Sequence, residues 1–471
     1  MTECTQSSFP FASHFSRQVV ARFDGGQITS DAGALLLRPV EQRTGILRQF
    51  AACFRDYRKP ELVEHTVGEL VRQRVYALAL GYEDLNDHDQ LRQDPLLALL
   101  SGKSDPEGEH RRRRQDRGKA GAGKSTLNRL ELTQPDAHRQ TRYKKIVLDD
   151  QAVDRLLVDL YIQAQARQPQ RIVLDLDATD DPVHGEQEGR FFHGYYGGYC
   201  YLPLYIFVGE HLLCARLRPS NIDASAGALE EIQRIVEQLR RAWPDVEIVL
   251  RADSGFCRDA ILSWCEHNRV GYVFGLARNE RLVKKLRKPM KEARRQWQQT
   301  AKPARVFAEF RYRTRETWSR ARRVIGKAEY LDKGENPRFV VTSFRPEQMQ
   351  ARRVYEKFYC ARGDMENRIK EQQLALFADR TSTSWMRSNQ IRLYFSSIAY
   401  GLLQALRRLG LAGTQMAQAQ CQTIRLRLLK IGAQVCVTVR KIWISLASAH
   451  PAAELFAQVY GNLVGAVAPG G

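Results

Sequence analysis

Two aspartates in phase on one short apolar run are the first residues of this chain that could do chemistry. The run is RIVLDLDATDD, residues 171–181. Because successive side chains of a strand point to opposite faces, its Ile and Leu residues would face one side of a sheet and Asp175 and Asp177 the other. Burying an unpaired carboxylate is costly, so acids on such a strand are ordinarily ion-paired or bind a metal. The run is therefore a candidate site in which both aspartates stand equal.

A third acid follows a second apolar strand. Asp253 comes directly after IVLRA, and Ser254 and Gly255 turn the chain away. In α/β sheets ligands bind outside the carboxyl ends of the strands, so this position suits a functional acid. The alternative is that Asp253 simply caps the N-terminus of a helix.

A fourth acid lies on a predicted helix. In YCARGDMENRIKEQQ, residues 359–373, helical spacing places one set of side chains on one face. These side chains are Tyr359, Arg362, Glu366, Lys370 and Gln373. An exposed ladder of ion pairs, worth only tenths of a kcal/mol, is the alternative interpretation. The sharper interpretation is a glutamate that a helix delivers against the strand acids.

Two strand aspartates and one helix glutamate are the oxygen ligands that hard cations such as Mg²⁺ or Mn²⁺ prefer. Two such ions about 3.5 to 4 Å apart can activate a water or a 3′-hydroxyl on one side of a phosphodiester and stabilise the leaving oxygen on the other. Without a cation, clustered carboxylates would repel one another.

The elements that must position these acids follow from the hydrophobic spacing. After residue 181, short aromatic and β-branched runs separated by glycine predict two or three antiparallel strands. A helix over 223–243, a strand from 246, a helix over 259–267 and a strand from 271 follow. The order β-β-β-α-β-α-β predicts an α/β fold in which helices cover a mixed sheet, as in a ribonuclease-H-like domain.

The rest of the chain is expected to be mostly helical. Residues 1 to about 30 look irregular, and the later patterns predict helices over 61–80, 83–100, 153–168, 354–377, 388–409 and 414–449. The resulting parts are a helical N-terminal DNA-binding region (1–168) with a basic arm (101–123), the first part of the catalytic core (169–278), a basic β-rich insertion (279–346), the glutamate helix (347–380) and C-terminal helices (381–471).

The charge balance points to a polyanionic partner. The 471 residues include 73 Lys or Arg against 53 Asp or Glu, a net charge of +20, although a merely solvated basic surface is the alternative. Residues 278–327 alone hold eighteen Lys or Arg against four Glu, with Trp297, Tyr312 and Trp318 interleaved as rings on which bases could stack. The run of Arg111, Arg112, Arg113 and Arg114 is equally consistent with DNA contact and with solvated charge.

Several other classes of protein are disfavoured. The longest apolar runs fall short of the about 20 residues that span a bilayer, and the first residues lack the pattern of a secretory signal. The nine cysteines contain no Cys-x-x-Cys pair, so neither a zinc site nor a disulfide framework is indicated. We therefore expect a cytoplasmic protein that does not associate with membranes.

The order of these motifs resembles a known family. LDLDAT, LRADSGF and a Tyr-x-x-Arg-x-x-x-Glu helix after a long insertion are similar to the DDE transposases of bacterial insertion sequences. The stretches FDGGQITSDAGALLL, RVYALALGYEDLNDHDQLRQDP, KSTLNRLE and HGEQEGRFFHGYYGGYCYLPLYIF resemble the insertion sequence family 1380 branch of that group.

The resemblance implies that Asp177, Asp253 and Glu366 form the catalytic, metal-binding triad for two Mg²⁺ or Mn²⁺ ions, and it favours Asp177 over Asp175. Tyr359 and Arg362 would lie near DNA phosphate. A lysine is often found seven residues after the glutamate in such transposases; here that position is Gln373, and Lys370 is the nearby cation.

The same resemblance implies a bacterial, nucleoid-associated enzyme that cleaves the ends of an insertion sequence and joins them to target DNA. Its expected partners are terminal inverted repeats, target DNA and a second copy of the chain, as a homodimer on DNA.

Three alternatives accompany this prediction. GKAGAGKS, residues 118–125, matches the phosphate-loop pattern of an ATPase in full, but a charged arm rather than an apolar strand precedes it. A catalytically inactive DNA-binding relative is the second. A metal site at His184, Glu186, Glu188 and His193 is the third, and because their spacing fits no common zinc pattern, loop and strand surface is the favoured interpretation.

Overall fold

The computed structural model describes residues 8–465 and divides into two compact units. As far as they are described, Met1–Asp149, Ala375–Phe377 and Phe395–Gly471 form the first unit, and Asp150–Leu374 and Ala378–Tyr394 form the second. Segments from both ends of the chain thus share one unit, and the second unit holds all the predicted catalytic acids.

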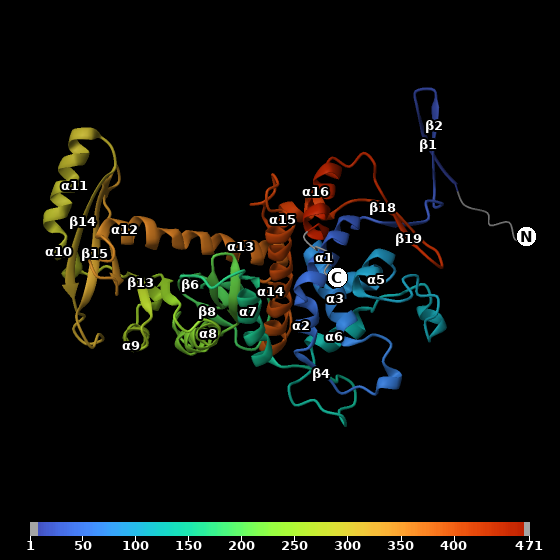
Figure 1. The fold of residues 1–471 in the computed structure, drawn as a ribbon, viewed down its shortest axis with the longest axis horizontal. Helices are drawn as coiled ribbons and strands as arrows, with labels where there is room; N and C mark the ends of the chain where they lie inside the picture. Colours follow the sequence, from blue (N-terminus) through green and yellow to red (C-terminus); the bar gives the residue numbers. More distant parts are fainter. Residues whose placement is uncertain (1–7, 466–471) are drawn as a thin grey trace, which may run out of the picture. The chain divides into compact units, whose positions relative to one another are not determined.

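A nine-stranded mixed sheet is the centre of the second unit (Figure 1). Its strands are β6 (Arg171–Ala178), β10 (Leu204–Val208), β11 (His211–Arg216), β12 (Glu247–Ala252), β13 (Gly271–Leu276), β14 (Ala304–Tyr312), β15 (Arg322–Leu331), β16 (Gly334–Glu335) and β17 (Arg338–Thr342). The order is β11-β10-β6-β12-β13-β17-β15-β14, with β16 beside β15. β10 is antiparallel to both β11 and β6, whereas β12 is parallel to both β6 and β13. The predicted α/β fold with a mixed sheet is confirmed.

Helices and turns link these strands. They are α7 (Asp150–Ala164), α8 (Ala228–Ala242), η5 (Ser254–Phe256), α9 (Asp259–His267), α10 (Glu280–Lys285), α11 (Arg287–Thr300), α12 (Ala351–Arg353), η6 (Val354–Tyr359), η7 (Cys360–Arg362) and α13 (Gly363–Leu376). A small second sheet has the order β7-β9-β8, from β7 (Asp181–Pro182), β8 (Phe191–His193) and β9 (Gly198–Tyr201).

The period-two pattern of β6 sorts its side chains between two cores. Ile172, Leu174 and Leu176 are fully buried in a cluster with side chains of α8 and α9. The opposite face of the sheet packs against another cluster, in which Val249 of β12 meets Val354 of η6. The strand is therefore covered on both faces, and the face that carries Asp175 and Asp177 turns toward the segment that leads to Glu366.

The insertion between the second and third acids extends the main sheet. Its strands β14, β15 and β17 continue the sheet beyond β13, through antiparallel pairing of β17 with β13. The insertion that the sequence predicted as basic and β-rich also contains two helices, α10 and α11, which precede these strands. Leu282, Leu286 and Met290 supply the buried stripe of these helices at helical spacing.

The predicted glutamate helix is continuous but not uniform. α12 widens into a π-helical turn over η6, tightens to a 3₁₀ turn over η7 and then becomes regular in α13. Figure 1 shows this run reaching from the strands of the insertion back to β6. Such π-helical turns are frequent at functional sites.

The described part of the first unit is mainly helical. Its helices are η1 (Ala32–Leu36), α1 (Leu37–Thr44), α2 (Ile46–Ala51), η2 (Pro60–Leu62), α3 (Val67–Leu80), η3 (Leu85–Asp87), α4 (His88–Leu91), α5 (Pro95–Ser101), η4 (Arg114–Asp116), α6 (Lys124–Glu131), α15 (Cys421–Ile424), η8 (Arg425–Leu429) and α16 (Ala453–Val464). α14 (Met386–Leu409) belongs to the second unit up to Tyr394 and to the first from Phe395. The predicted helix over 61–80 begins only at Val67, because Thr66 and Glu69 form a capping box there.

Two segments of the first unit form strands that the sequence did not predict. Residues 8–29 were expected to be irregular but form β1 (Ser8–His14), β2 (Arg17–Arg22) and β3 (Gln27–Thr29). Residues 414–449 were expected to be helical, but after η8 they form β18 (Ala433–Val437), which pairs with β3, and β19 (Ile442–Leu446), which pairs with β18. Gly432 ends the helical pattern, and alternation at period two takes over. β4 (Phe54–Asp56) and β5 (Ile146–Leu148) pair separately.

No helix in residues 8–465 is long and apolar enough to cross a membrane.

Candidate active site

Asp177 and Asp253 lie at the carboxyl ends of adjacent parallel strands. In the register of β6 and β12, Leu176 pairs with Ala252, and each aspartate is the next residue along its strand. The two carboxylates therefore leave the sheet at the same edge, as the sequence predicted.

Asp253 also caps a turn, so the structural alternative is observed. Its Oδ1 accepts a hydrogen bond of 2.8 Å from the backbone N–H of Gly255, at the start of η5. Within the described residues Oδ2 accepts no hydrogen bond. Capping thus fixes the orientation of Asp253 and leaves one carboxylate oxygen for a ligand.

Arg362 joins two members of the triad. Its Nη1 donates to Oδ2 of Asp177 at 3.2 Å, and its Nη2 donates to Oε1 of Glu366 at 2.7 Å. The predicted spacing explains the second contact, because Arg362 and Glu366 are four residues apart on one helix face. One guanidinium therefore holds the strand acid and the helix acid, which lie 189 residues apart in sequence, around a single positive charge.

Burial dominates the electrostatics of Asp177. It raises the pKa of this carboxyl to about 6 from 3.8; Arg362 opposes the shift, and Asp253 and Glu366 add to it. Clustered, poorly solvated carboxylates of this kind are found at metal and catalytic sites. A cation near Asp177 would relieve both the desolvation and the repulsion.

Asp175 has a different role from its neighbour. Its carboxylate receives hydrogen bonds from Nε and Nη2 of Arg251, at 2.5 and 2.7 Å, and the two residues pair directly across β6 and β12. Arg251 also donates to the backbone carbonyl of Phe358 at 2.6 Å. Asp175 therefore forms a buried ion pair that ties the sheet to the glutamate helix.

Tyr359 lies beside Asp253 and a cavity. Burial raises the pKa of the Tyr359 hydroxyl, and the negative charge of Asp253 adds to this. A cavity of about 370 Å³ is lined by Ser254, Gly275, Leu276, Ala277, Arg278, Asn336, Pro337, Arg338, Phe339, Tyr355 and Tyr359. The cavity is close to the triad and has two arginines in its wall.

Gln373 and Lys370, which follow Glu366 on the same helix face, have different surroundings. Gln373 donates from Nε2 to the backbone carbonyl of Asp180 at 3.1 Å, and so ties the helix to the chain just beyond Asp177. Lys370 is exposed and takes part in no ion pair among the described residues. Its predicted contact with DNA stays a prediction.

The predicted carboxylate ligands are of the right type for a metal ion, but their arrangement is not that of a metal site. The carboxylates are suitable ligands for Mg²⁺ or Mn²⁺, but no group of three His, Cys, Asp or Glu side chains within residues 8–465 is spaced to hold a metal ion. This finding covers the triad and also the set of His184, Glu186, Glu188 and His193. In the triad, the Arg362 guanidinium lies between two of the three ligands that the sequence predicted.

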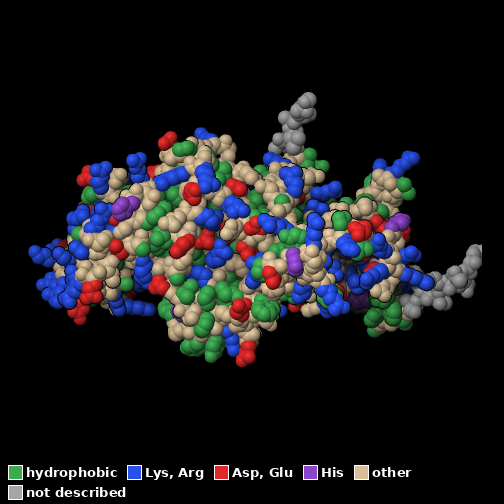
Figure 2. Space-filling model, turned by 90° about the horizontal axis from the view of Figure 1, so that it is seen from below, with side chains coloured by type: hydrophobic (Ala, Val, Ile, Leu, Met, Phe, Trp, Pro, Cys, Tyr) green, Lys and Arg blue, Asp and Glu red, His purple; other side chains and the backbone are tan. Residues whose placement is uncertain are grey.

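The insertion carries many cations. Exposed basic side chains of α10 and α11 include Arg281, Lys284, Lys285, Arg287, Lys288, Lys291, Arg294 and Arg295. Figure 2 shows Lys and Arg side chains gathered at this end of the molecule. The expected role of the interleaved rings is wrong for two of them: Tyr312 and Trp318 are buried and pack edge to face in the core.

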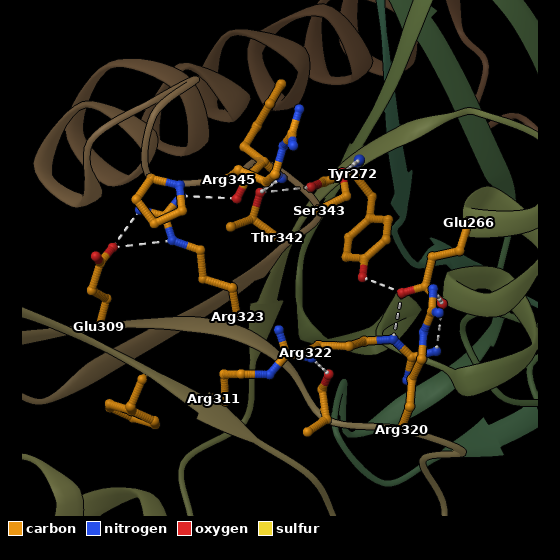
Figure 3. Close-up of a pocket in the computed structure, with 14 residues that line it drawn as sticks. Glu266, Tyr272, Glu309, Arg311, Arg320, Arg322, Arg323, Thr342, Ser343 and Arg345 are labelled. Carbon is orange, nitrogen blue, oxygen red and sulfur yellow. Dashed lines mark hydrogen bonds and ion pairs between the residues drawn. The ribbon is translucent and has the colours of Figure 1, made fainter.

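A pocket of about 550 Å³ is lined by residues on and beside β14, β15 and β17 of the insertion, and by Glu266 of α9 and Tyr272 of β13 (Figure 3). Its wall contains five arginines against two glutamates: Arg311, Arg320, Arg322, Arg323 and Arg345 with Glu266 and Glu309. Glu266 accepts from Arg320 and Arg322, and Glu309 pairs with Arg323. The arginines Arg311 and Arg345 have no acidic partner within the described residues, so the pocket keeps excess positive charge.

The arginine run of the basic arm divides into two pairs. Arg111 donates to Glu64 at 2.7 Å and to backbone carbonyls of residues 119–121, and Arg112 donates to the carbonyl of Glu61. Arg113 and Arg114 are exposed, line an open hollow and make no side-chain hydrogen bond or ion pair in the described part of the chain. The second pair therefore has no side-chain contact in the described chain that a partner would have to displace.

The segment that matches a phosphate loop is not arranged as one. The backbone N–H groups of Gly121 and Ala122 donate to Arg92 and Gln73, so they are not available to a phosphate. Lys124 contacts Asn86 and Asp89. A phosphate loop follows a strand, whereas the 3₁₀ turn η4 precedes this segment.

Sequence reasoning missed two residues of the site. Arg251 stood in the quoted motif LRADSGF, and its alternation with Asp253 along β12 was the available signal. Tyr196 was not singled out, yet burial raises the pKa of its hydroxyl to about 12, and the Asp180 and Asp177 carboxylates add to this. No local pattern could have linked that residue to Asp177.

Carboxylates from two adjacent parallel strands and a helix, gathered at one edge of a mixed sheet, define an α/β protein with an acidic site. The family model for the transposase DDE domain group 1 matches residues 11–467, so the chain belongs to this family of transposases. The coarser part of the predicted resemblance is thereby confirmed.

Comparison with solved structures finds a similar chain in the cryo-EM structure of a piggyBac transposase synaptic complex with hairpin DNA. The sequences are 11% identical, the TM-score is 0.39, and the match covers 85% of this chain and 80% of that one. No curated protein matches the chain.

Proposed function

We propose that this transposase cleaves DNA at the ends of an insertion sequence and transfers the freed 3′-hydroxyl ends into target DNA. The observation that carries the proposal is the convergence of Asp177, Asp253 and Glu366, from two adjacent strands and one helix, within a chain of the DDE family. The insertion sequence family 1380 branch, implied by the quoted motifs, is part of the same proposal.

Asp177, Asp253 and Glu366 would hold two Mg²⁺ or Mn²⁺ ions. When bound, such ions supply activation of the attacking oxygen and stabilisation of the leaving oxygen at a phosphodiester. The protein side chains do the positioning: the cap on Gly255 orients Asp253, and Arg362 holds Asp177 and Glu366 toward one point. With cations at the three carboxylates, the Arg362 guanidinium would be the side chain placed to contact a DNA phosphate.

The strand order supports a ribonuclease-H-like core. Three antiparallel strands, β11, β10 and β6, are followed by the parallel strands β12 and β13, with helices between. This is the order that the sequence predicted for such a domain. We assign the catalytic role to this part of the sheet and a DNA-holding role to the strands that extend it.

DNA contact is assigned to four surfaces. They are Tyr359 with Arg362 beside the triad, Lys370 on the glutamate helix, the cationic insertion, and Arg113 with Arg114 on the arm. Terminal inverted repeats are assigned to the N-terminal region, and the end DNA near the triad to the insertion. Two copies of the chain would act together on paired ends in the bacterial cytoplasm at the nucleoid. Sequence-independent attraction to phosphate is what such cationic surfaces supply.

A cleavage assay on DNA that carries the inverted repeats flanking the gene tests the proposal. With Mg²⁺, wild-type protein is expected to release 3′-hydroxyl ends, and Asp177→Asn, Asp253→Asn and Glu366→Gln are each expected to abolish cleavage while retaining binding. Retained cleavage in Asp253→Asn overturns the assignment of the triad. Wild-type protein that binds but does not cleave supports the inactive relative instead.

The ATPase alternative is tested with Lys124→Ala, because Lys124 would be the phosphate-binding lysine. The contacts of Lys124 with Asn86 and Asp89 lead us to expect no ATP hydrolysis by wild-type protein and no change in cleavage in the variant. ATP-dependent activity that disappears in Lys124→Ala supports the alternative.

A further inference from the structure

A hairpin of aromatic residues is attached to the strand that carries Asp177. It consists of β8, β9 and the turn at residues 194–197, and we call it the aromatic hairpin. β7 begins three residues after β6 ends, and its Asp181 pairs with Tyr201 of β9. The hairpin is thus anchored four residues from a catalytic acid.

The aromatic hairpin exposes rings instead of burying them. Tyr195 is 87% exposed and Phe192 is 59% exposed, and Phe191 and Tyr199 are also exposed. Phe192 and Tyr199 pair across the two strands with ring centroids 5.8 Å apart, and Tyr195 stacks edge to face on Tyr196 at 5.0 Å. Large exposed aromatic clusters of this kind mark a binding surface.

The tip of the aromatic hairpin has open space around it. Nothing lies within 4 Å of where a Cβ would stand on Gly194, Gly197 or Gly198, and Gly197 has a positive φ of +70°. The backbone at these three glycines therefore has open space around it. The conformation of the turn depends on glycine, and its rings are free to meet a partner.

The aromatic hairpin leads directly into β10, whose Tyr205 pairs with Asp177 of β6, and Tyr196 lies in the turn of the hairpin. Tyr196 is partly buried, and burial raises the pKa of its hydroxyl to about 12, with further contributions from the Asp180 and Asp177 carboxylates. The exposed rings therefore lie on strands that are joined, through β7, to the strand that carries Asp177. A ligand on the rings is consequently next to whatever lies at the triad.

The charge of the surface selects among ligands. A DNA backbone would require several cations, yet the cation that lies over these rings is Arg190, which stacks on Tyr199 at 4.7 Å. Flat ring faces without charge suit nucleobases, because base–aromatic stacking tolerates any sequence. A base reaches such a ring only after leaving its own stack, as happens when enzymes extrude a nucleotide.

We propose that the aromatic hairpin stacks against unpaired bases of the DNA end, beside the phosphodiester that the triad cleaves. This inference rests on the proposed function and adds a base-binding surface to it. By holding bases that have separated, Phe192 and Tyr195 lower the cost of opening the duplex at the cleavage point.

Cleavage of paired and mismatched ends tests the inference. The double variant Phe192→Ala, Tyr195→Ala is expected to cleave a fully paired end about tenfold more slowly or worse, since stacking of even one base is worth that factor. Two mismatches next to the cleavage point are expected to restore most of the rate. Tyr195→Phe in the otherwise wild-type chain should cleave far better than Tyr195→Ala, because it keeps the ring.

A photochemical crosslink gives a readout that does not depend on activity. 5-Iododeoxyuridine is placed on either side of the cleavage point and bound to Glu366→Gln protein, which is expected to bind without cleaving. The crosslinked peptide should map to residues 190–201. Tyr460→Ala, which removes an exposed ring of α16, is the matched control and should change neither readout.

The outcomes separate the two proposals. Wild-type protein that neither binds nor cleaves terminal-repeat DNA overturns the proposed function. Normal cleavage by the double-alanine variant, or crosslinks that map only outside residues 190–201, overturns the role of the hairpin while leaving the triad intact.

Discussion

The guanidinium of Arg251 donates two hydrogen bonds, of 2.5 and 2.7 Å, to the carboxylate of Asp175, and the two residues pair directly across β6 and β12. Two residues further along β6, the Asp177 carboxylate has Arg362 of the glutamate helix as its cationic partner. The same face of one strand thus presents a structural acid and a catalytic candidate. Asp175 is paired with Arg251 and Asp177 with Arg362, and this difference in partner distinguishes the structural acid from the catalytic candidate.

Loss of the Asp175 charge should destabilise the fold. The side chains of Asp175 and Arg251 are only 5% and 11% exposed, so Asp175→Asn leaves a buried guanidinium without its charge partner. Breaking such a pair costs about 3 kcal/mol, whereas replacing both partners by apolar side chains is often neutral. Urea unfolding should show this loss for Asp175→Asn and its recovery in Asp175→Leu, Arg251→Met. An Asp175→Asn variant as stable as wild type contradicts the structural role.

Loss of the Asp177 charge should instead stabilise the fold, by an amount that depends on pH. A carboxyl whose folded pKa is raised from 3.8 to about 6 favours folding while protonated. Its contribution is fully present below the unfolded pKa and is lost as pH rises through about 6. In EDTA, the free energy of unfolding of Asp177→Asn, relative to that of wild type, should therefore rise by about 3 kcal/mol between about pH 4 and pH 7. A stability difference that does not change with pH contradicts this expectation.

Gly275 of β13 should be essential for cleavage although it carries no functional group. A Cβ at this position would lie 2.6 Å from the Tyr359 hydroxyl and 2.9 Å from the backbone N of Ser254. Gly275→Ala must therefore displace Tyr359 or the turn that holds Asp253. We expect a stability loss of about 1 to 3 kcal/mol and, at temperatures where the protein is folded, a clear loss of cleavage.

The control for this change is Gly401→Ala in α14, where nothing lies within 4 Å of the added Cβ. It should leave cleavage unchanged and stability equal or slightly higher. Full cleavage by folded Gly275→Ala would mean that Tyr359 and the turn tolerate displacement.

Within the basic arm, neighbouring arginines should have separable effects. Arg111→Ala removes contacts to Glu64 and three backbone carbonyls and should lower stability. Arg113→Ala, Arg114→Ala should leave the unfolding midpoint unchanged and weaken DNA binding. If each arginine neutralises one phosphate, the slope of log K against log salt should fall by about 2. An unchanged slope would exclude these two side chains from the DNA surface.

Local periodicity in the sequence determined much of the site. Alternation in residues 171–177 required a strand with Asp175 and Asp177 on one face, and spacing of three and four in residues 359–373 required Arg362 and Glu366 to meet on a helix. These features depend on backbone geometry alone, and they could be predicted before any contact between distant residues was known. The resemblance of the motifs supplied the family.

Only the tertiary structure decided the partners of those residues. Asp175 and Asp177 are indistinguishable by periodicity, and their arginines lie 76 and 185 residues away in sequence. The strands of β18 and β19, predicted as helix, and the burial of Tyr312 and Trp318, predicted as DNA-facing rings, likewise depend on neighbours from distant segments. Local backbone geometry sets the face of a helix or strand on which a residue lies. Its charge partner and its exposure are set instead by packing between segments that are far apart in the sequence.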